Sequence, residues 1–126
     1  MRLHKITKQQ LLAEPFSKDA QKLACAIYST YINNGKELSM NIKISLIINL
    51  FKLQDDINSI NFITIVLEEL CEPIAVKDFK YSGNLYSTRF LRFFSYKFNE
   101  EFLEIDLNAE FLHAEQEYMS KRFLTC

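Results

Sequence analysis

The chain has 126 residues, of which 48% are apolar and 25% charged, and its formal charge is −1. This length predicts a single domain over residues 1–126 with one hydrophobic core, and no stretch approaches the roughly 20 consecutive apolar residues that span a bilayer. The near-neutral charge excludes a protein that is basic over its whole surface, so any nucleic-acid contact would need a local basic patch.

The first predicted element is a helix of about 17 residues that ends at residues 33–35 (Asn-Asn-Gly). Ser17 is suited to cap its first turn, and Asp19 complements the helix dipole. Residues 6–13 predict a short preceding helix, which Pro15 separates from the first. The long helix keeps a 3.6-residue period at the apolar positions Ala20, Leu23, Ala24, Ile27 and Tyr31.

A short strand and a second helix follow. Residues 37–43 alternate apolar and polar side chains, which is the period of a half-buried strand. Residues 46–53 predict a helix with Ser45 as its N-cap.

The third predicted helix is capped by Asn58 or Ser59 and ended by Pro73. It is apolar around nearly its whole circumference, so some apolar residues should face away from the core. Phe62 and Ile65 lie on its sides and indicate a second packed surface, where a protein partner would bind. The helix has no Lys or Arg.

The C-terminal third predicts strands and a last helix. Residues 74–76 indicate a short strand and residues 81–84 (Tyr-Ser-Gly-Asn) a turn. Residues 85–112 predict a hairpin of two aromatic and β-branched strands around a short polar turn, followed by a helix that Asn108 caps. The second strand has one apolar face with Leu103, Ile105 and Leu107.

This order of elements predicts an α+β protein, specifically a winged-helix-like helical core with a C-terminal β-hairpin and a terminal helix. In the winged variant of helix-turn-helix, the second helix of the pair can enter the major groove of DNA.

No catalytic or metal site is predicted. His4 and His113 lack the spacing of helical metal pairs. The adjacent carboxylates at 68–69 would point in different directions on a helix, and those at 100–101 fall in the predicted turn. Three cysteines without a C-x-x-C spacing indicate a reducing compartment and buried thiols. We therefore predict a cytoplasmic protein that is not an enzyme, takes no cofactor and has no membrane contact.

A basic and aromatic cluster occupies residues 77–97. Its cations could form a wing that contacts DNA phosphates. They could instead keep the hairpin hydrated or pair with the acidic neighbouring strand, in which case the aromatic residues belong to the core. The candidate DNA-binding residues are Lys77, Lys80, Arg89, Arg92 and Lys97.

Three segments resemble the N-terminal winged-helix domain of plasmid replication initiators of the Rep type: residues 16–23 (Phe-Ser-Lys-Asp-Ala-Gln-Lys-Leu), residues 67–70 (Leu-Glu-Glu-Leu), and residues 94–96 with 103–111 (Phe-Ser-Tyr and Leu-Glu-Ile-Asp-Leu-Asn-Ala-Glu-Phe). Such initiators typically carry two winged helices and bind repeated origin sequences, and their first domain also serves dimerisation. The resemblance implies double-stranded DNA binding in replication control, with Arg89, Arg92 and Lys97 as phosphate contacts.

Two functions therefore remain. The preferred one is a DNA-binding module that resembles a replication initiator domain and contacts phosphates through a basic wing. The alternative is a protein interaction or dimerisation domain without direct DNA contact, because the chain has room for one winged helix only and its third helix carries acidic residues.

Overall fold

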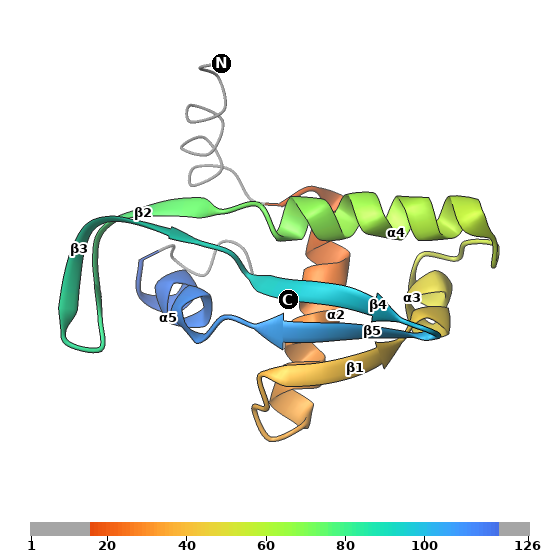
Figure 1. Cartoon of the computed structure of the whole chain (residues 1–126), viewed down its shortest axis with the longest axis horizontal. Helices are drawn as coiled ribbons and strands as arrows, with labels where there is room; N and C mark the ends of the chain where they lie inside the picture. Colours follow the sequence, from red (N-terminus) through yellow and green to blue (C-terminus); the bar gives the residue numbers. More distant parts are fainter. Residues whose placement is uncertain (1–15, 119–126) are drawn as a thin grey trace, which may run out of the picture.

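The computed structural model describes residues 16–118, which form a mixed α+β fold (Figure 1). The predicted helix over residues 6–13 lies outside the described residues. The elements, in chain order, are α2 (Lys18–Asn33), β1 (Ser39–Lys43), α3 (Ile44–Leu50), α4 (Ile57–Leu70), β2 (Ile74–Tyr81), β3 (Asn84–Leu91), β4 (Phe94–Asn99), β5 (Phe102–Leu107) and α5 (Ala109–Glu117).

Helix α2 begins as the sequence predicts. The hydroxyl oxygen of Ser17 accepts a hydrogen bond from the backbone N–H of Ala20 at 3.3 Å, and Asp19 lies in the first turn. Leu23 and Ile27 are fully buried, so the apolar face of α2 forms part of the hydrophobic core.

The predicted caps of the next two helices are wrong. Ser45 lies inside α3, because β1 runs directly into this helix and Lys43 is its N-cap. Helix α4 begins earlier than expected, since the carboxylate of Asp56 accepts a hydrogen bond from the backbone N–H of Ser59 at 3.1 Å. An Asp at the N-cap satisfies a free N–H group of the first turn, and Asn58 is therefore already helical.

Three strands form an antiparallel sheet in the order β1-β5-β4. Helix α2 lies behind this sheet in the view of Figure 1. The predicted alternation of the last strand is confirmed, because Leu103, Ile105 and Leu107 are buried and the residues between them are not. Buried residues on the inward face of the sheet are Met40, Phe94, Leu103, Ile105 and Leu107.

The predicted hairpin over residues 85–112 is wrong in its first half. The chain leaves the strand at residues 92–93, so β3 pairs with β2, and only β4 pairs with β5. Phe93 and Phe94 are both buried, whereas a continuous strand would point them to opposite faces. The break lets both rings enter the core, where their centroids are 5.1 Å apart.

The β2–β3 hairpin, residues 74–91, is called the arm below. It extends to one end of the molecule, and α5 lies beside it (Figure 1). The turn at its tip is confirmed at Ser82 and Gly83, which have φ angles of 53° and 83°. One face of the arm packs on α5, because the ring of Phe79 lies 5.9 Å from that of His113 and 5.0 Å from that of Tyr118.

The cysteines are in two different states. Cys71 is a free, half-buried thiol, as expected. Cys25 is disulfide-bonded, so the expectation of reduced thiols is wrong for this residue.

Candidate interaction surfaces

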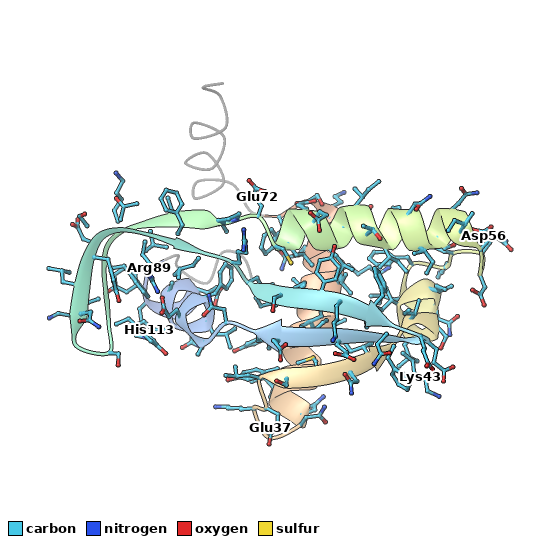
Figure 2. The ribbon with its side chains drawn as sticks, viewed as in Figure 1. Glu37, Lys43, Asp56, Glu72, Arg89 and His113 are labelled. Atoms are coloured by element: carbon cyan, nitrogen blue, oxygen red, sulfur yellow. The ribbon has the colours of Figure 1, made fainter. Side chains whose placement is uncertain are left out.

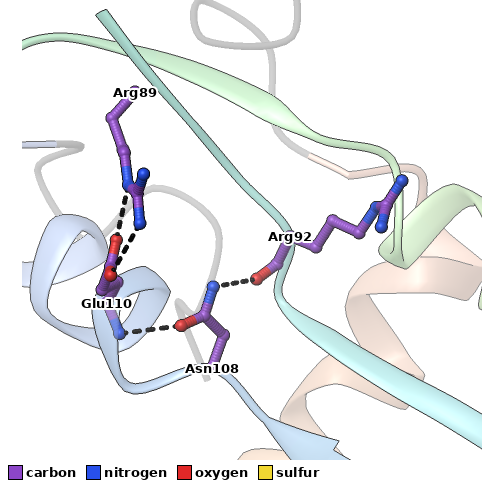
Figure 3. A network of polar contacts seen from close by, with 4 residues as sticks. All are labelled: Arg89, Arg92, Asn108 and Glu110. Atoms are coloured by element: carbon purple, nitrogen blue, oxygen red, sulfur yellow. Dashed lines mark hydrogen bonds and ion pairs between the residues drawn. The ribbon is translucent and has the colours of Figure 1, made fainter.

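Arg89, one of the five predicted DNA contacts, is held by an ion pair. Its Nε and Nη2 groups donate to the two carboxylate oxygens of Glu110 at 2.9 and 3.0 Å (Figure 3). The guanidinium carbon also lies 4.6 Å from the ring centroid of Tyr86. The hydrogen bond to Glu110 raises the pKa of Arg89. This bidentate geometry links the arm to α5, so Arg89 has a structural role in this fold.

Asn108 strengthens the same connection. Its side-chain oxygen accepts from the backbone N–H of Glu110 at 3.0 Å, which confirms Asn108 as the cap of α5. Its side-chain amide donates to the carbonyl of Arg92 at 3.1 Å, and its backbone N–H donates to the carbonyl of Phe93 at 3.0 Å. These two hydrogen bonds thus connect the break between β3 and β4 to the start of α5.

Lys97 and Arg92 also lie beside carboxylates. The Nζ atom of Lys97 is 3.7 Å from a carboxylate oxygen of Glu104, directly across on β5. The exposed Arg92 side chain points away from Glu110 and toward the C-terminal end of α4 (Figure 3). There it lines a cleft of about 340 Å³ together with Glu68 and Glu72.

Lys77 and Lys80 differ from the other three cations. Both are exposed residues of β2, and among residues 16–118 neither has a carboxylate within ion-pair distance. Phe90 and Leu85 on the neighbouring β3 strand are also exposed, by 56% and 70%. The predicted basic cluster is therefore divided: Arg89 and Lys97 are paired with carboxylates, whereas Lys77 and Lys80 are unpaired and share the arm with exposed apolar groups.

The acidic residues of α4 have structural partners. The hydroxyl of Tyr96 donates to the carboxylate of Glu68. Burial and this hydrogen bond raise the pKa of Tyr96 to about 12. Glu69 accepts two hydrogen bonds from Ser17 at the start of α2. Neither contact could be predicted from local sequence patterns, because the partners are separated by 28 and 52 positions.

The outward face of α4 is nevertheless largely uncharged. Ile57 and Ile65, two helical turns apart, are each 70% exposed, and the exposed Asn61 lies between them. Phe62 is half-buried and packs edge-on against Phe51, with ring centroids 5.3 Å apart. Of the two predicted partner-binding residues, Ile65 lies on this outward face, and Phe62 makes a contact within the domain.

The charge of the described residues is negative. Residues 16–118 contain ten Lys and Arg and fifteen Asp and Glu, which gives a formal charge of −5. The whole chain carries −1, so within residues 16–118 DNA contact would depend on the few exposed cations that have no acidic partner.

The described residues hold no group of three or more His, Cys, Asp or Glu arranged to bind a metal ion. Among residues 16–118, no helix is both long and apolar enough to cross a bilayer. No protein-family model matches the chain, and searches of curated proteins and of solved structures gave no match either.

Proposed function

We propose that this domain is a non-enzymatic association module with a winged-helix-like fold. The pairing of β1 with β5 and of β5 with β4, next to the consecutive helices α3 and α4, supports the fold proposal. In this description, α3 and α4 correspond to the helix-turn-helix pair, the β4–β5 hairpin is the wing, and the arm is an insertion between them.

We further propose that the domain associates with a second protein chain, normally another copy of itself, through the outward face of α4. The observation that carries this proposal is the pair Ile57 and Ile65, which expose large aliphatic side chains on one face of a helix without cations. Exposed apolar surface of this kind favours a protein partner, because burying it is stabilising. A phosphate backbone offers no comparable gain.

A substitution at Ile65 tests this function. Ile65→Lys should convert a self-associating wild-type protein into a folded monomer, measured by sedimentation velocity with circular dichroism as the check on folding. Leu85→Lys is the matched control, because Leu85 is equally exposed but lies on the arm. A wild-type protein that stays monomeric, or a dimer that survives Ile65→Lys, would contradict the proposal.

DNA binding remains the second candidate, and the exposed Lys77 and Lys80 favour it. In this proposal the arm contacts phosphates through these two lysines, with Arg92 at its base, in a replication-initiator-like protein as the sequence resemblance implies. Arg89 and Lys97 then support the fold by pairing with Glu110 and Glu104.

Fluorescence anisotropy of a labelled random-sequence duplex at low and physiological salt tests the second candidate. The double variant Lys77→Ala/Lys80→Ala should bind more weakly, and its affinity should depend less on salt because fewer counterions are released. Lys18→Ala/Lys36→Ala, which removes two exposed lysines elsewhere, is the control. Equal affinity for the two double variants would remove the arm from any DNA site.

A further inference from the structure

A cleft of about 290 Å³ lies where three distant segments of the chain meet: the start of α3, the loop before α4 and the β4–β5 turn. The backbone N–H of Ile44 donates to the carbonyl of Glu101 at 2.9 Å, which holds the turn against α3. Figure 2 labels Lys43 and Asp56 at this end of the molecule. The cleft is separate from the arm, which extends from the opposite end (Figure 1).

The cleft combines an apolar floor with an acidic rim. Ile44, Ile48 and Ile60 line it, and all three are at least half-buried. The rim carries three exposed carboxylates and one cation, a local charge of −2. These rim residues are Asp55, Glu100, Glu101 and Lys43.

We propose that this cleft binds a basic segment of a partner protein, with an apolar side chain on the isoleucine floor and Lys or Arg residues on either side. The cations would face Asp55 on one wall and Glu101 on the other, because the two carboxylates come from different segments that border the same cleft. The local charge of −2 on the rim favours a basic partner over an acidic one.

A phosphate-bearing ligand does not fit this chemistry, because three carboxylates would repel it. The site is also distinct from the outward face of α4 that we propose for self-association. The two proposals can therefore fail independently.

Binding of a fluorescein-labelled peptide to the whole chain tests the inference. The probe is a seven-residue peptide that alternates Lys with Leu, and it should bind with an affinity that falls as salt is added. Two control peptides isolate the two features of the cleft: one replaces every Lys by Glu, and the other replaces every Leu by Ser. Both should bind much more weakly than the probe.

The variant Asp55→Asn/Glu101→Gln removes two rim charges while keeping side-chain size. It should weaken probe binding about tenfold, as expected for two partly screened ion pairs. Glu37→Gln/Asp106→Asn, which neutralises two exposed carboxylates that do not line this cleft, should bind the probe like the wild type. The proposal also expects Ile65→Lys to retain full peptide binding.

Equal binding of the probe by the two neutralised variants would overturn the inference, as would equal binding of the probe and the Ser-containing peptide. Self-association that is lost in Asp55→Asn/Glu101→Gln but kept in Ile65→Lys would assign the cleft to a second copy of the chain. That result would contradict a separate basic partner and would also place the self-association surface away from α4.

Discussion

Glu69 of α4 holds the N-terminus of α2 through Ser17. One carboxylate oxygen accepts the Ser17 backbone N–H at 2.8 Å, and the other accepts the Ser17 hydroxyl at 2.7 Å. Ser17 also caps α2 by accepting the N–H of Ala20. The negative charge therefore lies at the positive end of the α2 dipole, where it is stabilising. Glu69 therefore has a structural role on α4, and its presence there does not have to be explained by an effect on ligand binding.

Glu69→Ala should lower the free energy of unfolding by about 1–2 kcal/mol, because it removes two charge-assisted hydrogen bonds and a favourable helix-dipole contact. Urea unfolding followed by circular dichroism measures the change. Glu37→Ala, at an exposed position, is the control and should have little effect. A Glu69→Ala protein as stable as the control would mean that the contact contributes nothing in solution.

The ion pair between Arg89 and Glu110 should stabilise the position of the arm. A double-mutant cycle with Arg89→Ala and Glu110→Ala should give a favourable coupling energy that solvent screening keeps small, since the two side chains are 38% and 22% exposed. Either single variant should also increase hydrogen exchange of the arm, which loses its bidentate link to α5.

Arg92→Ala is the matched control for this cycle, because Figure 3 shows its side chain pointing away from Glu110. It should leave exchange in the arm unchanged. An additive double mutant, with no coupling, would mean that the ion pair contributes nothing and that other contacts, such as the rings of Phe79 and Tyr81 against His113, hold the arm on α5.

The elements that local signals specify were predicted well. Helix α2 has a cap, a periodic apolar face and a stop, each of which is encoded by residues within the helix or next to it, and the structure follows all three. The inward face of β5 and the cap of α5 by Asn108 are likewise local features. Such predictions succeed because neighbouring residues alone determine the outcome.

The strand break at residues 92–93 could not be predicted in this way. Residues 85–98 have the composition of one continuous strand, and only packing in the tertiary core requires both Phe93 and Phe94 to be buried.

The partners of the candidate DNA-binding residues could not be predicted from local sequence either. Lys97 and Arg89 look alike in the sequence as free cations of a wing. In the structure, strand pairing brings Lys97 beside Glu104, and the packing of α5 on the arm brings Arg89 beside Glu110. The winged-helix and DNA-binding predictions themselves remain predictions.

Substitutions in the turn at the tip of the arm should change the stability of the protein. Gly83 has a φ of 83° and Ser82 a φ of 53°, which is left-handed backbone that most side chains avoid. Gly83→Ala should destabilise the protein by about 1 kcal/mol, although a Cβ atom there would meet no atom within 4 Å. Ser82→Asn should be neutral or slightly stabilising, because Asn tolerates this conformation better. Thermal unfolding of both variants checks the two directions, and a Gly83→Ala protein as stable as wild type would contradict the assigned turn.

The packing of Cys71 and Tyr96 predicts a loss of stability at alkaline pH. Burial, together with the charge of Glu68, raises the pKa of the Cys71 thiol from 9.0 to about 12. Burial and the hydrogen bond to Glu68 raise that of Tyr96 from 10.0 to about 12. Since both pKa values are higher in the folded state, the folded protein binds these protons more tightly than the unfolded chain does.

Their stabilising contribution should therefore be complete below about pH 9 and disappear as the pH rises toward 12. The loss should be on the order of 1–2 kcal/mol, because Tyr96 is only half-buried and solvent screens its contribution. Urea unfolding across this pH range should show a steeper decline for the wild type than for Cys71→Ser/Tyr96→Phe, in which neither group titrates. Tyr31→Phe is the control variant and should follow the wild type. If the double variant also followed the wild type, the alkaline transition would originate in other groups, and the contact between Tyr96 and Glu68 would not persist in solution.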